Sequence, residues 1–320
     1  MLANDLLTRM EQGDRRALAR LMTLVEARPP EIYAVMSRVA RLARGTPRLG
    51  ITGPPGAGKS TLIDGLIRLL RGRGKTIGAV VIDPSSPFSG GAVLGDRVRM
   101  QDHAVDPGVF IRSLGSRGSH GGISRATMEV ALLLDAFGMD EILIETVGVG
   151  QTELDIMGIA DTTVVVLVPE AGDTVQTLKA GLMEIGDIFV VNKADREGAL
   201  RMAAELRAMV EQTPSPKSWS APVLLASARE GQGLEELLEA IVGHRQYMSD
   251  RPEAEAFRRN FHRRQLIEII LAELGMRLDA NPAAEAIYER VMAGAQDPYA
   301  AAAELLTDPA RLAELLRLRR

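Results

Sequence analysis

Cysteine is absent from this chain of 320 residues. Without thiols the protein can form no disulfide, no thiolate metal site and no covalent thiol intermediate. Histidine is scarce as well, and its four positions are too scattered to indicate a zinc-binding pair: His103, His120, His244 and His262. These absences exclude a disulfide scaffold and a cysteine enzyme, and they leave the chain poorly equipped to carry a transition metal.

A strong charge of either sign and a long hydrophobic run are also missing. The net charge is −4 and the sequence pI is about 5.7, so no global positive field attracts nucleic acid or anionic lipid. The longest apolar run, residues 162–168, is too short to span a bilayer. Asp5, Arg9 and Glu11 interrupt the N-terminal segment where a signal peptide needs an apolar core. We therefore expect a soluble, cytoplasmic protein that binds neither nucleic acid nor a membrane.

The feature that is present and most informative is a glycine-rich stretch at residues 53–61, Gly-Pro-Pro-Gly-Ala-Gly-Lys-Ser-Thr. It fits the pattern Gly-x-x-x-x-Gly-Lys-Ser/Thr, in which backbone N–H groups and a helix N-terminus bind phosphate oxygens. A chance turn is the alternative, but a strand pattern precedes the stretch and helical apolar spacing follows it. The residues expected to hold phosphates are Gly53, Gly56, Ala57, Gly58, Lys59, Ser60 and Thr61, with Ser60 also binding Mg²⁺.

A second motif, Asn192-Lys193-Ala194-Asp195, follows much later in the chain, and the pair Ser227-Ala228 comes after it. Alone, an Asn and an Asp after a strand often make only a turn. In this order after a phosphate loop, they indicate a guanine site formed by Asn192, Lys193, Asp195, Ser227 and Ala228. The Asp195 carboxylate would accept hydrogen bonds from N1–H and the 2-amino group of guanine, whereas adenine would leave that acceptor unpaired.

Carboxylates end two further predicted strands, at Asp83 and Glu145. Glu145 opens Glu-Thr-Val-Gly, which stands where GTPases usually have Asp-x-x-Gly, so the Gly148 amide is expected to sense the γ-phosphate. The longer glutamate suits a contact to the metal through water. Each acid, taken singly, is also consistent with an ordinary polar residue at a strand end.

The segment 84–99 is rich in Gly, Pro and Ser, and we interpret it as a switch. Within it, Asp96 is the candidate to position the attacking water or a metal-bound water, and Arg97 or Arg99 to neutralise transition-state charge. The expected catalytic residues are thus Lys59, Asp96, Glu145 and Gly148, and the expected metal-site residues are Ser60, Asp83, Asp96 and Glu145. A second glycine-rich loop, 113–122, contains Arg117 and His120, and an ordinary surface loop explains it equally well.

Hydrolysis by the isolated chain is expected to be slow. Gly148 is followed by Val149, where many signalling GTPases have a glutamine that orients water, and Gln151 lies two residues further on. We therefore expect a partner to complete the site and raise the rate.

Apolar runs that alternate with helical patterns predict a doubly wound, mainly parallel α/β sheet with its ligands at the carboxyl ends of the strands. The runs lie at 48–52, 76–82, 109–112, 141–144, 162–168, 188–191 and 223–226. Three segments are expected: an N-terminal helical extension at 1–45, a P-loop G domain at 46–247, and a C-terminal helical extension at 248–320.

The predicted C-terminal helices include one opened by Asp308-Pro309. Their apolar stripe can fold back on the sheet or meet a second copy of the chain, and the sequence favours neither. The arginines at 258, 259, 263 and 264 could form an RNA-binding face, but nearby glutamates favour a solvated helix surface.

Three long strings in the G domain, at 83–97, 112–122 and 145–153, closely resemble the methylmalonyl-CoA mutase-associated GTPase family. The resemblance implies a homodimeric G-protein chaperone that binds GTP, GDP and Mg²⁺ and acts on the adenosylcobalamin-dependent mutase. It implies that nucleotide turnover gates cofactor loading and protects the mutase. It also implies that the C-terminal helices form the dimer contact and that the segment 168–179 is an additional switch.

Three alternatives remain open at this stage. One is a P-loop phosphotransferase or kinase linked to amino-acid transport, which would need an acceptor pocket and gains nothing from the guanine motif. A second is a GTPase that inserts a metal into another metalloenzyme. The third is a scaffold in which nucleotide only stabilises the fold, which would show no turnover even with the mutase present.

Overall fold

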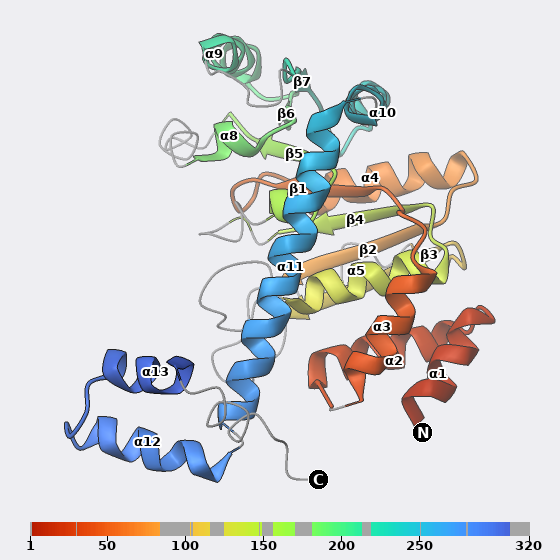
Figure 1. Ribbon diagram of the computed structural model, residues 1–320. Coiled ribbons are helices and arrows are strands. Elements are labelled where there is room, and N and C mark those ends of the chain that lie inside the picture. Colours follow the sequence, from red (N-terminus) through yellow and green to blue (C-terminus); the bar gives the residue numbers. More distant parts are fainter. Residues whose placement is uncertain are drawn as a thin grey trace. The chain divides into compact units, whose positions relative to one another are not determined.

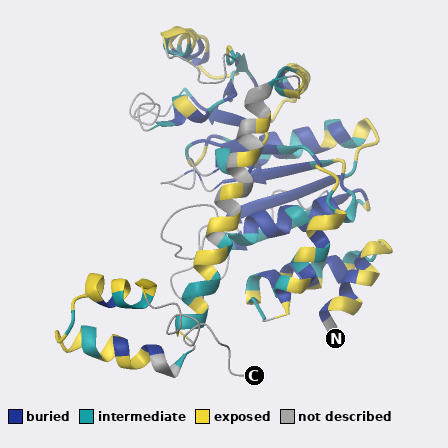
Figure 2. Ribbon diagram, in the orientation of Figure 1, coloured by how far each residue is buried: buried dark blue, intermediate teal, exposed yellow. Residues whose placement is uncertain are grey.

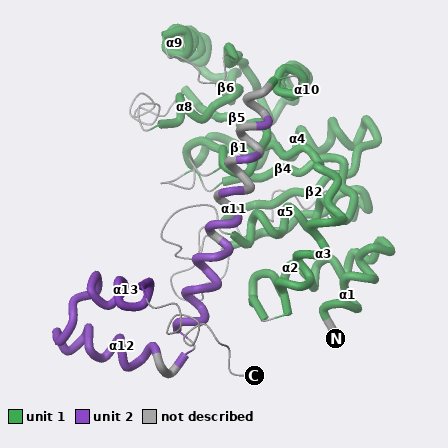
Figure 3. Tube along the Cα trace, viewed as in Figure 1, with its two compact units in different colours: residues 1–254 green, residues 255–320 purple. Residues whose placement is uncertain are grey.

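The computed structural model describes residues 2–29, 31–83, 103, 105–115, 125–146, 148, 156–169, 181–212, 219–249, 251–279 and 281–307. The chain divides into two compact units, residues 1–254 and 255–320 (Figure 3). The first unit contains the sheet and the predicted nucleotide motifs, and the second is helical. Each unit is described by itself.

Within the described part of the chain, seven strands form one sheet in the order β3-β2-β4-β1-β5-β6-β7 (Figure 1). Every pairing between these strands is parallel, as predicted. The strands are β1 (Arg48–Thr52), β2 (Ile77–Asp83), β3 (Val109–Gly115), β4 (Glu141–Glu145), β5 (Thr162–Leu167), β6 (Ile188–Val191) and β7 (Val223–Leu225). Strands β2, β3 and β4 lie on one side of β1, and β5, β6 and β7 on the other, so the direction of winding reverses beside β1.

Helices cover both faces of the sheet, which makes the fold doubly wound. Ala79 and Val81 of β2 pack with the apolar residues of α4 and α10, while an added Cβ on Gly78, the residue before Ala79, would meet Leu134 of α5. Because side chains alternate along a strand, α4 and α5 must lie on opposite faces. Burial on both faces explains why β1, β2, β4, β5 and β6 are mainly apolar, and these strands are mostly dark blue in Figure 2. The α-helices of this unit are α1 (Leu2–Glu11), α2 (Arg15–Ala27), α3 (Ile32–Leu42), α4 (Lys59–Gly72), α5 (Arg125–Phe137), α8 (Met183–Ile185), α9 (Ala199–Gln212) and α10 (Leu234–Ser249).

The N-terminal helices are joined to the sheet by a fully buried carboxylate. Helices α2 and α3 pack against α5, and Asp135 on α5 accepts hydrogen bonds from the segment that leads into β1. Its Oδ1 accepts from the Arg44 amide at 2.8 Å and from the Thr46 hydroxyl at 2.8 Å, and its Oδ2 accepts from the Gly45 amide at 3.2 Å. Several donors compensate for burying this charge, so the path of the chain into β1 is fixed.

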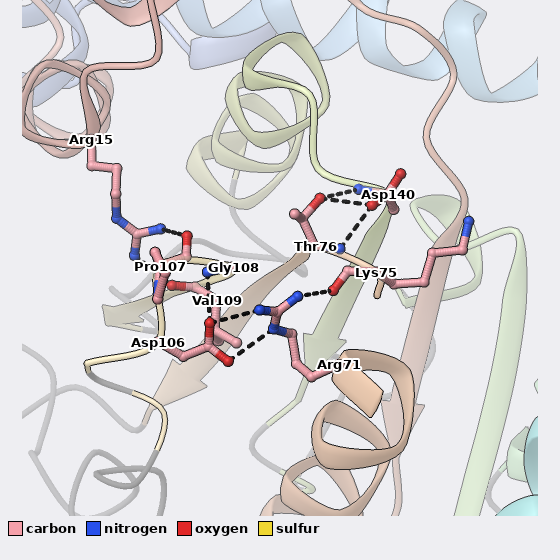
Figure 4. A network of polar contacts seen from close by, with 9 residues as sticks. All are labelled: Arg15, Arg71, Lys75, Thr76, Asp106, Pro107, Gly108, Val109 and Asp140. Carbon is pink, nitrogen blue, oxygen red and sulfur yellow. Dashed lines mark hydrogen bonds and ion pairs between the residues drawn. The ribbon is translucent and has the colours of Figure 1, made fainter. Parts of the chain in front are cut away.

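In each edge strand, the carbonyl group of the first residue accepts a hydrogen bond from an arginine side chain. Arg15 of α2 donates to the carbonyls of Pro107 and Val109 at the start of β3, as Figure 4 shows. At the other edge, Arg207 of α9 donates to the Val223 carbonyl of β7 at 3.1 Å. The exposed hydrogen-bonding groups at each edge are thereby partly occupied.

A polar network joins the amino ends of the sheet strands, opposite the predicted nucleotide side (Figure 4). Arg71 at the end of α4 donates to both carboxylate oxygens of Asp106 at 2.8 and 2.9 Å, and the Gly108 amide donates to the same group at 2.7 Å. The Arg71 guanidinium, with the Gly108 amide, holds the pKa of Asp106 below its ordinary value. Nearby, the Thr76 amide and hydroxyl lower the pKa of Asp140 in the same way.

The second unit consists of helices. They are α11 (Pro252–Asp279), α12 (Pro282–Met292) and α13 (Pro298–Thr307), the first of which begins at the end of unit 1. A small core forms around Ala284, Ile287 and Ala301, with Leu278, Val291 and Leu305 packed against it. Helix α11 leaves several large apolar side chains exposed: Leu266, Ile267, Ile270, Leu271 and Met276.

Several strand ends differ by one residue from the sequence expectations, and two departures are larger. Residues 113–115, expected to begin a loop, instead extend β3, because β2 continues to Asp83 and pairs with β3 up to Gly115. Helix α13 was not predicted, although Asp297 caps it by accepting from the amides of Tyr299 and Ala300. The helix predicted to open at Asp308-Pro309 lies outside the described residues.

No helix in the described part of the chain is both long enough and apolar enough to cross a membrane.

The lowered pKa of Asp106 predicts an acid-dependent contribution to stability. A carboxyl whose pKa is lower in the folded protein stabilises the fold above its unfolded pKa, and this stabilisation is lost as the pH falls through the folded value. We expect Asp106→Asn to lower the melting temperature at pH 7, and the difference from the wild type to shrink below about pH 4. Thermal denaturation followed by circular dichroism at pH 7, 5 and 3 measures this. Glu239→Gln on the exposed face of α10 is the control, and an Asp106→Asn deficit of equal size at pH 3 and pH 7 would contradict the assignment.

Candidate functional site

The predicted site residues lie at the carboxyl-terminal end of the sheet, where each follows or ends a strand. The glycine-rich loop follows β1, Asp83 ends β2, Glu145 ends β4, Asn192 follows β6, and Ser227 follows β7. Parallel pairing alone brings these positions to the same edge. They span five of the described strands, with β1 near the centre.

The loop between β1 and α4 depends on glycine where other parts of the chain come close. At Gly53, φ is +133° and an added Cβ would lie 2.0 Å from the Val166 carbonyl oxygen of β5. At Gly58, φ is +86° and an added Cβ would lie 2.4 Å from Nδ2 of Asn192. Gly56 also has a positive φ but has open space beside it. The loop is therefore held between β5 on one side and Asn192 on the other.

Lys59, the first residue of α4, is almost completely buried at 6% exposure. Its Nζ donates hydrogen bonds to the carbonyl oxygens of Gly53 at 2.8 Å and Pro54 at 3.2 Å. The ammonium group is thus held inside the loop by main-chain oxygens of that same loop. A positive charge beside a helix N-terminus makes an anion site.

Ser60 and Glu145 form the second polar contact of the site. The Ser60 hydroxyl donates to Oε1 of Glu145 at 2.7 Å, and both side chains are buried. Asp83, 1% exposed, lies on the neighbouring strand, two residues beyond Val81, the residue that pairs with Glu145. Hydroxyl and carboxylate oxygens are the donors that Mg²⁺ prefers, so these residues suit a magnesium ion.

The described residues contain no group of three or more His, Asp or Glu side chains that could hold a metal ion. Mg²⁺ commonly binds through one or two carboxylates together with substrate phosphates and water. The donor set at this site fits that mode of binding and not an all-protein cage.

Gly148 lies directly against the glycine-rich loop. Its φ is +85°, and an added Cβ would lie 2.2 Å from the Gly53 carbonyl oxygen and 2.6 Å from Nζ of Lys59. No side chain fits here, and the backbone of Gly148 therefore reaches the place where Lys59 is held. An amide in this position can contact the same anion as Lys59.

Asn192 joins the phosphate side of the site to the predicted guanine side. Its Nδ2 donates to the Ala57 carbonyl at 2.8 Å, and its Oδ1 accepts from the Ala228 amide at 3.1 Å. The side chain is only 2% exposed, so both bonds are made in a buried environment. This reach from β6 to two other loops was not predicted, because no local signal in the sequence reports it.

The predicted guanine residues are held together by further contacts. The Ser227 hydroxyl donates to Oδ1 of Asp195 at 3.0 Å, and the Ala194 amide donates to the Ala226 carbonyl at 2.9 Å. Lys193 has a left-handed backbone with φ of +57°, which a non-glycine residue adopts rarely. The loops after β6 and β7 thus form one hydrogen-bonded unit.

Several predicted residues lie outside the part of the chain that the structure describes. They are Asp96, Arg97 and Arg99 of the predicted switch, Arg117 and His120 of the second loop, Val149, Gln151 and most of the segment 168–179. The described residues that the structure brings to one edge of the sheet are Gly53, Gly56, Ala57, Gly58, Lys59, Ser60, Thr61, Asp83, Glu145, Gly148, Asn192, Lys193, Asp195, Ser227 and Ala228.

Comparison with known proteins gives consistent results. Residues 18–283 match the model of a family described as methylmalonyl-CoA mutase-associated GTPase MeaB. A protein of Pyrococcus horikoshii is 45% identical over 306 residues, which cover 93% of this chain and 96% of that protein. The GTPase ArgK of Escherichia coli is 39% identical over 243 residues, 73% of each chain. The crystal structure of an LAO/AO transport system kinase has a TM-score of 0.70 to this chain at 27% identity, covering 94% of this chain and 95% of that one.

Gly148→Ala is predicted to impair GTP hydrolysis, because its methyl group would displace the Gly53 carbonyl and the Lys59 ammonium. Displacements on this scale cost about 100-fold in rate. Release of phosphate from GTP under single-turnover conditions measures the loss. Gly13→Ala is the matched control, since Gly13 has a nearly identical φ of +86° with open space beside it. A Gly148→Ala chain that hydrolyses GTP at the wild-type rate would show that Gly148 lies away from the reacting phosphate.

Asp195→Asn is predicted to weaken guanine binding and to favour xanthine, because an amide replaces one acceptor by a donor that suits the 2-oxo group of xanthine. Loss of a charged hydrogen bond corresponds to a roughly 10- to 100-fold weaker affinity for GDP. Calorimetry with GDP, XDP and ADP measures the three affinities. Asp161→Asn, at the opposite edge of the sheet, should leave all three unchanged. Equal affinities of the wild type for GDP and ADP would refute the assignment.

Proposed function

Because the chain belongs to the methylmalonyl-CoA mutase-associated GTPase family MeaB, we propose that it is a G-protein chaperone for an adenosylcobalamin-dependent methylmalonyl-CoA mutase. GTP binding and hydrolysis would set the conformation that controls cofactor loading and protects the mutase. The observation that carries the proposal is the family match over residues 18–283, which spans the sheet and the site described above. That the chain is a P-loop GTPase follows from the same match and from its GTPase relative.

The reaction transfers the γ-phosphoryl group of GTP to water, so that the bond to the β-γ bridging oxygen breaks and GDP and phosphate are released. Lys59 and the amides of the loop would hold the β- and γ-phosphates, and the Gly148 amide would donate to a γ-phosphate oxygen. Lys59 is buried, so water screens its charge less than it would at the surface. Its position is set before substrate arrives, because it is already held by Gly53 and Pro54.

Ser60 would hold Mg²⁺ directly, while Glu145 and Asp83 would hold it through water. When bound, the ion supplies positive charge to the β- and γ-phosphate oxygens. The hydrogen bond between Ser60 and Glu145 supports this assignment, because it places a hydroxyl and a carboxylate together at the start of α4. We assign the orientation of the attacking water to Asp96, which lies outside the described residues.

The purine would bind between the loops after β6 and β7. The Asp195 carboxylate would select guanine, and Lys193 and the Ser227-Ala228 turn would hold the ring. The support is geometric: Asn192 bonds both to the phosphate loop and to Ala228, so the two halves of the site keep a constant separation. Such a site would distinguish guanine from adenine because adenine leaves the carboxylate acceptor unpaired.

Hydrolysis by the chain alone would be slow, since Val149 occupies the position where many GTPases orient water with glutamine. The mutase would complete the site and raise the rate. We also propose that the chain forms a homodimer through α11. The exposed apolar residues Leu266, Ile267, Ile270 and Leu271 support this role, because a second copy of the helix would remove them from water.

The amino-acid transport kinase alternative, suggested by the name of the similar crystal structure, predicts transfer of the γ-phosphoryl group to an acceptor other than water. The metal-insertion alternative predicts association with a different metalloenzyme. The assay described below, which follows both phosphate release and association with the mutase, distinguishes the chaperone from the kinase and from the metal-insertion GTPase.

We expect addition of purified mutase to raise the rate of GTP hydrolysis about 100-fold, the scale of one added contact to the transition state. The assay follows release of labelled phosphate, and size-exclusion chromatography with GDP and with a non-hydrolysable GTP analogue tests association. Lys59→Ala should abolish hydrolysis, whereas Lys75→Ala, an exposed lysine at the opposite edge of the sheet, should not.

A mutase that fails to associate in every nucleotide state would refute the chaperone proposal and leave the GTPase intact. Transfer of label to an amino acid or a protein acceptor would favour the kinase instead.

A further inference from the structure

Two buried threonine hydroxyls meet where the chain leaves the sheet for the site. Thr52 is the last residue of β1, and Thr146 directly follows β4. The Thr146 hydroxyl donates to Oγ1 of Thr52 at 2.8 Å, and the Thr146 amide donates to the Ile51 carbonyl at 3.1 Å. Thr52 is 0% exposed and Thr146 is 1% exposed. The two strands are therefore joined one residue beyond their last regular pair, Ile51 with Glu145.

The pair is attached directly to groups of the proposed hydrolysis site. Thr52 immediately precedes Gly53, whose carbonyl accepts from Lys59. Thr146 immediately follows Glu145, which accepts from Ser60, and stands two residues before Gly148. A displacement of Thr146 relative to Thr52 would move Glu145 and Gly148 relative to Lys59.

Packing alone does not require hydroxyls at these positions. Thr52 pairs across the sheet with Val165, and the buried strands around it consist mainly of valine, isoleucine and leucine. Valine has the shape of threonine without the polar oxygen, so it would fill the same space. Burying a hydroxyl is unfavourable unless it is hydrogen-bonded, and here the two buried hydroxyls share a hydrogen bond.

We propose that Thr52 and Thr146 are a positioning pair that sets Glu145 and Gly148 against the phosphate-binding loop for hydrolysis. The inference rests on the hydrolytic roles assigned above and is independent of the mutase. The loop itself is held by β5 and Asn192, so loss of the pair would leave nucleotide binding intact. Hydrolysis depends on Gly148 and Glu145 being in place, so loss of the pair would slow the chemical step.

The test uses the full chain with Thr146→Val, Thr52→Val and the double variant. Single-turnover hydrolysis of GTP gives the chemical rate, and fluorescence titration with a labelled GDP gives the affinity. We expect Thr146→Val to lower the rate about tenfold and to change the GDP affinity less than twofold. The double variant should be no slower than the slower single variant, because either substitution removes the same bond. Thr146→Ser keeps the hydroxyl and should restore the wild-type rate.

Thr162→Val is the matched control. Thr162 begins β5, at the amino-terminal end of the sheet, and its buried hydroxyl lies 2.9 Å from Nδ1 of His244 in a hydrogen bond. Loss of this bond should lower the melting temperature without slowing hydrolysis. If Thr146→Val does not fold, Thr52→Val with Thr52→Ser as its rescue makes the same comparison. A wild-type rate in the folded valine variant, an equal loss in Thr162→Val, or losses that multiply in the double variant would each overturn the proposal. A chain that hydrolyses GTP but never binds the mutase would refute the chaperone role and leave the pair unaffected.

Discussion

The parallel pairing of β1 with β4 on one side and β5 on the other is the constraint on which the rest of the molecule depends. It places the glycine-rich loop between the ends of two neighbouring strands, so the loop must fit against the Val166 carbonyl and against Gly148 at the same time. Glycine is needed at these contacts because main-chain atoms, not side chains, approach each other. The position of the anion site is therefore set mainly by the pairing of the strands and less by the side chains that line it.

The site is assembled from short bonds between loops that are far apart in the sequence. Asn192 spans from the phosphate loop to the Ala228 turn, and Ser60 spans from α4 to β4. Each of these bonds is buried, so each has a larger effect on position than the same bond would have in water. In the proposed function, this arrangement would give a nucleotide two separate points of contact, one at the phosphate loop and one at the Ala228 turn. In that function, Asn192 would be the single side chain that joins the two points of contact.

Much of the fold could be predicted because its strands are continuously apolar and its loops carry recognisable motifs. The strands at 48–52 and 188–191 have the predicted bounds, whereas β3 runs three residues further than predicted because β2 pairs with it up to Gly115. Helix α13 was missed even though Asp297-Pro298 gives the same start signal as Asp308-Pro309. The contacts of Asn192 with Ala57 and of Thr52 with Thr146 could not be predicted, since they depend on strand register and not on local sequence. The residues of the predicted switch, Asp96 among them, stay a prediction.

The hydrogen bonds from arginine to the first carbonyl of each edge strand affect how this sheet can pair with strands of other molecules. Arg15 engages the start of β3, and Arg207 engages the start of β7. A further strand, whether from another protein or from a neighbouring copy, would have to displace these guanidinium groups before its backbone could register with the sheet. These arginines therefore hinder the pairing of β3 or β7 with a strand of another molecule, which is how sheets extend into fibrous aggregates.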